Sequence, residues 1–391
     1  MRSFDRIFSS MNHIKDSRLS PLLKYPGGKE KELPIILPAI PSDFKDYYEP
    51  FVGGGAVYWS VNAQHYYIND AAKKLIHLYS LIKEQDMYFL SMLYLIDEIW
   101  GSLDEITDNH AQNYLDLYKS IDNFEIAYSK LIAPLAERLK SQLDRLHIKA
   151  YEIFKQELFE NLLDKLHRLE KLQNQSGNFS KEDLILNLCS AQKMSFYNVI
   201  RELYNNEIEL NLPLSTTTAC FAFLRDYCYS SMFRYNKQGK FNVPFGGISY
   251  CKRRLTKRLL QMQNPEAIKQ LQKTTLGNED FRQFLKRNSP KKDDFVFLDP
   301  PYDTTFSSYA QLSFTQDDHK RLSRYLIKEC KARFILVIKN TPFIAKLYKN
   351  GCQTLYGKLQ VKDFESRYRV SFRNRNDHKT QHLLISNFEI K

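Results

Sequence analysis

The chain has 391 residues, 43% of them apolar, and a net charge of +12. With 26 Phe and 25 Tyr it can build large cores, which excludes a wholly disordered protein. At about 100–200 residues per domain, this length predicts two domains or three. The excess of basic residues is compatible with a polyanionic partner, although charge alone indicates only solubility and nonspecific attraction.

The cysteines and the hydropathy narrow the class of protein further. Six widely spaced cysteines without a CxxC pair are typical of reduced thiols in a cytoplasmic protein. No run approaches 18 continuous apolar residues, and the charged N-terminal stretch has no apolar core. We therefore expect a cytoplasmic protein that contacts no membrane and has neither a disulfide scaffold nor a secretory signal.

A short α/β unit is predicted over residues 20–80. A strand over 46–51 leads into Gly53-Gly54-Gly55, a helix is expected over 56–63, and a strand over 64–69 ends at Asp70.

Further parallel strands are predicted near the C-terminus. Residues 291–301 and 332–340 are apolar runs bounded by charges, as buried parallel strands are, with a helical segment over 316–331 between them. An antiparallel pair, 357–364 with 380–388, is expected to follow.

The middle of the chain is predicted to be helical. From Leu135 to Ser176 there is no Pro or Gly, and apolar residues recur every three or four positions. This spacing indicates a long amphipathic helix or a helical pair, which ends in a loop over 174–180. We interpret it as a helical insertion packed on its own domain, with a dimerising coiled coil as the alternative.

Charge is unevenly distributed along the chain. Residues 81–130 carry ten acidic and three basic side chains, whereas residues 224–260 carry nine basic side chains and one acidic one, interleaved with aromatic residues. Such a basic, aromatic stretch suits phosphate contact and stacking on bases, and a solvated basic loop is an equally good interpretation of this feature alone.

The strongest motif is Asp299-Pro300-Pro301-Tyr302, at the end of a predicted strand. Parallel strands deliver such residues to the edge of a sheet where ligands bind. A carboxylate beside a proline carbonyl offers two acceptors to an amino group, and the adjacent ring can stack on a planar base. A Pro-Pro turn after a strand is by itself more often structural, so the motif needs its companions.

The companion motifs are individually weak. The segment Glu49-Pro-Phe-Val-Gly-Gly-Gly55 is a Gly-rich turn that lets a ligand approach the backbone, and Asp70 can accept hydrogen bonds from ribose hydroxyls. Lys29, in the turn Pro26-Gly27-Gly28-Lys29, suits the carboxylate of an amino-acid moiety. Asp280 can accept from an adenine amino group while Phe281 packs on its ring.

Taken together, these motifs resemble those of the Dam-type adenine-N6 DNA methyltransferases of the alpha-ordered group. The resemblance covers about residues 20–80, 220–247 and 275–345, and more weakly 380–388. It implies an α/β fold with a Rossmann-like class I methyltransferase sheet and an inserted, largely helical target-recognition domain that contains a β-hairpin. The expected catalytic domain is residues 1–80 with 270–391, and the expected recognition domain is residues 81–269.

The resemblance also implies roles for individual residues. The catalytic element is Asp299, Pro300, Pro301 and Tyr302, of which Asp299, Tyr302 and the Pro300 carbonyl bind the extruded adenine. The S-adenosylmethionine pocket is expected to consist of Tyr25, Gly28, Lys29, Phe51, Gly53, Gly55, Asp70, Asp280 and Phe281. The residues expected to contact DNA are Lys24, Tyr229, Arg234, Asn236, Lys240 and Asn242. No metal is expected.

The chain departs from the family pattern at several positions. Tyr25 replaces a common Trp, and Ser230-Ser231-Met232 replaces a common Asn-Gly-Leu. Lys339-Asn340 precedes Thr341-Pro342-Phe343 where the family commonly has Asp. The helical region over about 85–200 has no counterpart in compact members. The expected cofactor survives these changes, whereas GATC is only a guess at the recognition sequence.

The expected reaction is direct methyl transfer from S-adenosylmethionine to N6 of a flipped-out adenine in duplex DNA. The absence of a Pro-Cys dipeptide removes the candidate for a covalent cytosine-C5 route. The alternatives are an RNA adenine or cytosine-N4 methyltransferase, a noncatalytic DNA-binding protein and, less favoured because of Asp299, a protein-glutamine methyltransferase. We expect a monomer or weak dimer, either an orphan enzyme or one with a cognate restriction endonuclease that acts separately.

Overall fold

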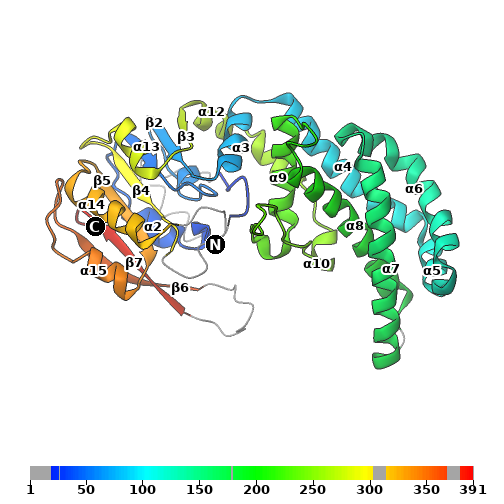
Figure 1. Ribbon diagram of the computed structural model, residues 1–391. Helices are drawn as coiled ribbons and strands as arrows, with labels where there is room; N and C mark the ends of the chain where they lie inside the picture. The colour runs from blue at the N-terminus through cyan, green and yellow to red at the C-terminus, as the bar shows by residue number, and fades with distance from the viewer. Residues whose placement is uncertain (1–18, 26, 178, 303–313, 368–378, 391) are drawn as a thin grey trace, which may run out of the picture. The chain divides into compact units, whose positions relative to one another are not determined.

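The chain divides into two compact units, Met1–Gln85 with Gln261–Lys391 and Asp86–Leu260. The structure is a computed structural model and describes residues 19–25, 27–177, 179–302, 314–367 and 379–390. The first unit contains a sheet and the second is mainly helical (Figure 1).

One mixed sheet of seven strands organises the first unit, in the order β3-β2-β1-β4-β5-β7-β6. β1 to β5 pair in parallel, and β7 lies antiparallel between β5 and β6. The prediction of an α/β fold is confirmed, as are the parallel strands β4 and β5 and the antiparallel C-terminal pair. The strands are β1 (Asp46–Glu49), β2 (His65–Asn69), β3 (Thr274–Gly277), β4 (Phe295–Leu298), β5 (Arg333–Lys339), β6 (Gln360–Arg367) and β7 (Lys379–Ser386).

Both faces of the sheet are covered, which explains why β4 and β5 are apolar almost throughout. Successive side chains of a strand point to opposite faces. Val296 and Leu298 therefore pack in a cluster with Phe284 and Leu322, from helices α13 and α14. On the other face the Phe295 ring lies 5.4 Å from that of Phe44.

Short helices connect the strands of the first unit. They are η1 (Lys29–Lys31), α2 (Leu33–Ala39), η2 (Tyr58–Ser60), α3 (Lys73–Lys83), α12 (Pro265–Gln272), α13 (Phe281–Asn288), α14 (Gln316–Lys328) and α15 (Pro342–Leu347). Thr315 caps α14 and Thr341 caps α15, each accepting a hydrogen bond from a backbone N–H of the first turn.

The helix predicted over 56–63 is wrong, because only the 3-10 turn η2 forms there. Residues 56–61 are all buried, so this segment has no polar face to turn towards solvent as a surface helix would. It instead carries Tyr58 and Trp59, both 0% exposed, into the core beneath the Gly-rich turn.

The second unit consists mainly of helices. They are α4 (Met87–Asn109), α5 (Ala111–Lys119), η3 (Ile121–Asn123), α6 (Phe124–Leu146), α7 (Ala150–Ser176), α8 (Lys181–Asn205), α9 (Leu214–Tyr227), η4 (Tyr229–Ser231) and α10 (Ile248–Cys251), with α11 (Thr256–Met262) at the boundary between the units. None of the helices in the described part of the chain is long and apolar enough to cross a membrane.

The predicted Leu stripe forms a helical pair. Residues 147–149 are not helical and separate α6 from α7. Helix α7 packs on both α6 and α8. Leu139 and Leu143 of α6 and Leu158 and Leu162 of α7 are all 0% exposed. The stripe is thus covered within a single chain, as expected for an insertion packed on its own domain.

Candidate active site

The predicted catalytic and cofactor motifs meet where the direction of strand order reverses. From β1 the chain proceeds through β2 to β3 on one side, while β4 and β5 extend the sheet on the other. β1 and β4 are hydrogen-bonded neighbours, so the turn 51–55 and the motif 299–302 both follow the carboxyl ends of adjacent parallel strands. Open α/β sheets bind their ligands at this switch point.

Asp299 is ion-paired with Lys29. The Nζ atom of Lys29 lies 2.7 Å from Asp299 Oδ1 and donates hydrogen bonds to the Tyr302 hydroxyl (2.8 Å) and the Gly27 carbonyl (3.1 Å). Lys29 is 3% exposed and the Asp299 side chain is 19% exposed. The two predicted motifs, 270 residues apart in the chain (29 against 299), are therefore one cluster. Pro300 in this motif is buried and Pro301 is exposed.

Opposing effects set the protonation of Asp299. Burial raises the pKa of its carboxyl group, and the ammonium group of Lys29 opposes this rise by Coulomb attraction and by hydrogen bonding. Lys29 is thus directed at the predicted catalytic carboxylate. Its predicted contact with the carboxylate of an amino-acid moiety stays a prediction.

The Gly-rich turn leaves little space above its backbone. Gly53 has φ +48°, and a Cβ atom there would lie 3.1 Å from the ring of Tyr25. Gly55 has φ +72°, and a Cβ atom there would lie 2.8 Å from the hydroxyl of Tyr79. Glycine is therefore required at both positions by conformation and by space. Gly28 closes the preceding turn by donating from its N–H to the Tyr25 carbonyl (3.1 Å).

Asp70 fixes this turn to the end of β2. Its Oδ2 atom accepts a hydrogen bond from the N–H of Gly53 (3.0 Å), and Oδ1 accepts from the N–H of Ala72 (2.9 Å). Both carboxylate oxygens thus face backbone donors at the carboxyl edge of the sheet. The predicted ribose contact of Asp70 stays a prediction.

Asp280 caps α13 and is joined to α14. Its Oδ1 atom accepts from the N–H of Arg282 (3.0 Å) and from Nη2 of Arg321 (2.8 Å). Arg321 was not predicted, because no local sequence pattern relates this arginine to Asp280. The predicted contact of Asp280 with an adenine amino group stays a prediction, and it would have to share this carboxylate with Arg321.

An aromatic cluster lies beside Asp280. The ring centroid of Phe281 lies 5.5 Å from that of Phe51 and 5.7 Å from that of Phe314, and the Arg321 guanidinium lies 5.2 Å above the Phe281 ring. Phe51 and Phe281 were both predicted to line the cofactor pocket, and the structure brings them together. Phe314 was missed because it precedes a helix and belongs to no motif.

Glu49 is a buried acidic residue for which no role was predicted. It ends β1, is 3% exposed, and accepts a hydrogen bond from the Tyr47 hydroxyl (2.7 Å). Burial raises the pKa of its carboxyl group well above the usual range, although the Tyr47 hydrogen bond opposes this, and the nearby carboxylates of Asp299 and Asp70 add to the rise. Carboxyl groups thus gather at the ends of β1, β2 and β4.

In the second unit, the segment predicted to be a recognition hairpin folds back on itself. Antiparallel bridges pair Cys228 with Phe245 and Tyr235 with Phe241. At the tip, Asn236 Oδ1 accepts from the N–H groups of Gln238 (3.0 Å) and Lys240 (2.9 Å).

The predicted DNA-contacting residues differ in their surroundings. Asn236 shapes the turn, and the Lys240 ammonium donates to Asn206 Oδ1 (2.8 Å). Arg234 and Asn242 are exposed, as is Lys24 in the first unit. These residues stay predicted DNA contacts.

Tyr229 lies beside a strained turn. It is 38% exposed, and Ser230 and Ser231 both have φ 53°, in the left-handed region that non-glycine residues seldom adopt. The Asn-Gly that is common in the resembling family would adopt this conformation at lower cost. Serine at positions 230 and 231 therefore costs conformational energy in a turn that lies next to a predicted DNA contact.

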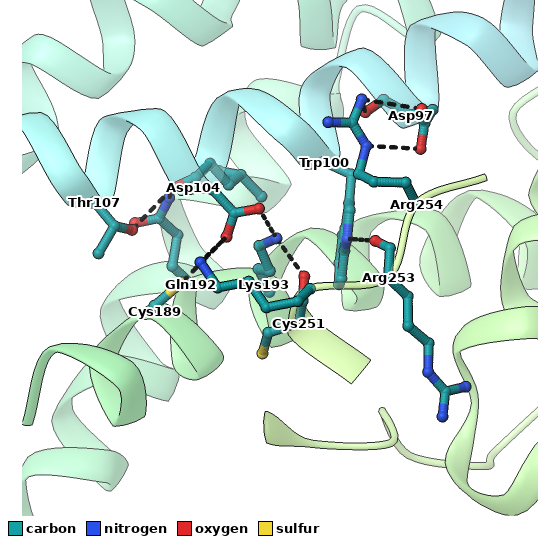
Figure 2. A network of polar contacts seen from close by, with 12 residues as sticks. Asp97, Trp100, Asp104, Thr107, Cys189, Gln192, Lys193, Cys251, Arg253 and Arg254 are labelled. Atoms are coloured by element: carbon teal, nitrogen blue, oxygen red, sulfur yellow. Dashed lines mark hydrogen bonds and ion pairs between the residues drawn. The ribbon is translucent and has the colours of Figure 1, made fainter. Parts of the chain in front are cut away.

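A polar network attaches the segment after the hairpin to α4 (Figure 2). Lys193 donates to Asp104 Oδ2 and to the Cys251 carbonyl, both at 2.7 Å. Trp100 donates from Nε1 to the Arg253 carbonyl (2.9 Å), and Arg254 is bonded to both carboxylate oxygens of Asp97. Figure 2 shows the Arg253 side chain pointing away from this network.

Within the described ranges, no group of three or more His, Cys, Asp or Glu side chains could hold a metal ion. All six cysteines lie in these ranges as free thiols.

Comparisons with known proteins agree on one family. The family described as "D12 class N6 adenine-specific DNA methyltransferase" matches residues 25–155 and 142–366. The chain is 25% identical over 375 residues to the type II methyltransferase M.CviBI of Paramecium bursaria Chlorella virus NC1A, covering 95% of this chain and 100% of that protein.

Two further relatives are similar to this chain over different shares of its length. The type II methyltransferase M.MjaIII of Methanocaldococcus jannaschii is 24% identical, over 85% of this chain and 88% of its own length. A DNA adenine methylase of Vibrio cholerae is 32% identical, but over only 34% of this chain and 47% of its own length. Because the family match covers most of the residues, the chain belongs to the D12 class N6 adenine-specific DNA methyltransferases.

Proposed function

We propose that this adenine-specific DNA methyltransferase transfers the methyl group of S-adenosylmethionine to N6 of an adenine extruded from duplex DNA. The observation that carries the proposal is the placement of Asp299 at the switch point of the sheet, ion-paired through Oδ1 with Lys29. No hydrogen bond to Oδ2 occurs among the described residues. This oxygen can therefore accept from an exocyclic amino group without breaking the ion pair.

The residues at the sheet edge fit a nucleoside cofactor. Gly53 and Gly55 hold the turn at the sheet edge in a left-handed conformation, and Phe51 and Phe281 offer apolar ring surfaces to a planar base. Tyr25, Phe51, Asp70 and Phe281 would hold S-adenosylmethionine there. When bound, it supplies an activated sulfonium methyl group, so the chemistry needs no covalent enzyme intermediate.

The chain's own residues hold the acceptor. An adenine inside a duplex cannot reach a carboxylate at a sheet edge, so the base must leave the stack at a cost of a few kcal/mol. Stacking on the half-buried Tyr302 ring and hydrogen bonds to Asp299 and the Pro300 carbonyl offset this cost. Lys29 favours the ionised form of Asp299, because it opposes the rise that burial causes in the pKa of that carboxyl group.

The second unit is proposed to recognise the target. Arg234 is exposed near the start of the hairpin segment and can bond bidentately to guanine in a major groove. Because Asn236 shapes the tip and Lys240 is bonded to Asn206, we assign base reading first to Arg234 and Asn242. Relatives named type II methyltransferases favour action at a specific site, as an orphan enzyme or beside a separate restriction endonuclease.

Methyl uptake by different polymers tests the proposal. Purified protein is incubated with S-adenosylmethionine labelled in the methyl group and with duplex DNA or RNA of matched sequence, and the product is hydrolysed. We expect label in N6-methyladenine from DNA. Label only in RNA, or in N4-methylcytosine, would instead support one of the other methyltransferases considered above.

A binding measurement separates the noncatalytic alternative. Calorimetry is expected to show binding of S-adenosylmethionine, whereas DNA binding without cofactor binding would support a noncatalytic DNA-binding protein. Single-molecule sequencing of DNA from cells that express the chain would then identify the methylated sites.

A further inference from the structure

Two residues outside every predicted motif contact the partners of Asp299. Glu32 lies three residues after Lys29, at the start of α2, and is 5% exposed. His382 lies on β7 and is 0% exposed. His382 Nδ1 is 3.3 Å from Glu32 Oε1, and Lys29 Nζ is 3.9 Å from Glu32 Oε2. The start of the first helical segment is thereby joined to a C-terminal strand.

His382 also contacts the proposed base-stacking residue. Its ring centroid lies 5.4 Å from that of Tyr302, with the planes tilted by 59°. On its other side the ring of Phe364 from β6 packs edge-on at 5.6 Å. Since the Tyr302 hydroxyl accepts from Lys29, the contacts form a closed ring of four residues: Lys29, Glu32, His382 and Tyr302. We call these four residues the support ring.

The support ring contains buried charged and polar side chains, whose burial costs folding free energy. Burying a carboxylate costs several kcal/mol, and an apolar pair of similar volume often packs as well or better. Glu32 and His382 also act on Asp299. Burial and Lys29 are the main influences on the pKa of that carboxyl group, to which Glu32 adds a rise and His382 a fall.

We propose that Glu32 and His382 are positioning residues for methyl transfer, which orient the Lys29 ammonium and the Tyr302 ring so that Asp299 and the extruded adenine meet in the reactive geometry. This inference rests on the proposed function. The two residues touch neither reacting atom, and they act through Lys29 and Tyr302. Small errors in the placement of reacting groups are expensive, roughly 100-fold in rate for a displacement of 1 Å.

The test uses the full chain with Glu32→Gln and His382→Gln. There are two matched controls. Glu30→Gln changes an exposed glutamate of η1, the 3-10 turn that contains Lys29. His65→Gln changes a half-buried histidine on β2 that is bonded to Thr275. The single-turnover rate of DNA methylation is measured with saturating cofactor and DNA, together with the dissociation constants of both and the thermal unfolding midpoint.

We expect the rate to fall roughly 10- to 100-fold in Glu32→Gln and His382→Gln, with both dissociation constants within about twofold of wild type. The two controls should keep the wild-type rate. The double variant should be scarcely slower than either single one, because both changes break the same ring.

A further substitution at His382 distinguishes its ring contact with Tyr302 from its pairing with Glu32, and it is expected to fold. His382→Phe keeps a ring against Tyr302 but cannot bond Glu32, so it should fold and still lose rate. Wild-type rates in folded His382→Phe and Glu32→Gln would overturn the inference, as would losses that only follow the folded fraction. If the wild-type chain instead methylated no DNA adenine, the proposed function itself would be overturned.

Discussion

Two buried lysine–aspartate pairs of nearly the same geometry occur in the two units. Lys29 lies 2.7 Å from Asp299, and Lys193 lies 2.7 Å from Asp104. The lysines are 3% and 0% exposed and the aspartates 19% and 21%. Distance and burial therefore do not distinguish the pair at the proposed reaction site from the pair in the helical unit.

The remaining contacts of each lysine distinguish the pairs. Lys193 donates to the carbonyl of Cys251, and its Nζ atom lies 4.5 Å from the centroid of the Trp100 ring (Figure 2). These contacts join buried residues of the second unit to one another. Lys29 contacts residues of loops at the switch point of the sheet, including the Tyr302 hydroxyl. Position at a ligand-binding edge, and not ion-pair geometry alone, therefore supports the role proposed for Lys29 and Asp299.

The largest expected effect is on catalysis at Asp299. Asp299→Ala should abolish methyl transfer, with a loss of roughly 1000-fold or more in single-turnover rate, because the amino group of the target loses its acceptor. The variant should still fold, as judged by circular dichroism, although its thermal midpoint should fall because the buried Lys29 loses its closest carboxylate. Wild-type methylation by this variant would refute the assignment of Asp299.

The matching change in the second unit should act on stability. Lys193→Met leaves Asp104 without its closest cation and the Cys251 carbonyl without a donor. We expect a loss of about 2–3 kcal/mol in the free energy of unfolding, somewhat below the cost for a fully buried pair. Urea denaturation measures this loss. A folded Lys193→Met protein with normal stability but no activity would contradict the distinction drawn between the two pairs.

Removing the charge of Lys29 should change the pH dependence of the rate. Ionised Asp299 is the stronger acceptor for the amino hydrogen, so activity should fall as the pH drops through its raised pKa. Lys29→Met removes the cation that opposes this rise, so the pKa of Asp299 rises further. The acidic limb of the single-turnover rate profile should therefore move to higher pH. An acidic limb at the wild-type pH would show that Lys29 does not control Asp299.

Two neighbouring arginines provide the finest comparison. Arg254 is bonded to the buried carboxylate of Asp97, whereas the Arg253 guanidinium lies 3.4 Å above the Tyr250 ring and points away from the network. Arg254→Ala should destabilise the protein by about 2 kcal/mol. Arg253→Ala should lower stability by no more than about 1 kcal/mol, through loss of the Tyr250 contact. It should also weaken DNA binding at all sequences and reduce the slope of log K against log salt by about 1.

Binding titrations at several salt concentrations and urea denaturation measure these two effects separately. Equal stability losses in both variants would show that Arg253 serves the fold as well. An unchanged salt slope for Arg253→Ala would show that Arg253 makes no contact with DNA phosphates.

Much of the sheet and most of the motif positions could be predicted from local patterns. The apolar runs of β4 and β5 indicate strands buried on both faces, and the order of the Gly-rich and Asp-Pro-Pro-Tyr motifs indicates an adenine methyltransferase. The helix expected over 56–63 failed because sequence pattern alone did not show that this segment would be buried on every side. Burial on all sides is decided by neighbours from β2, α3 and α12.

By itself, the sequence determined most of the strands, the family and the candidate residues, because each depends on near neighbours in the chain, whereas β3 was not predicted. Only the tertiary structure decided which of these residues meet. Parallel pairing of β1 with β4 places two motifs at one edge, and the antiparallel insertion of β7 beside β5 brings His382 to Glu32 and Tyr302. Contacts between residues hundreds of positions apart depend on strand order and register, which no local pattern encodes.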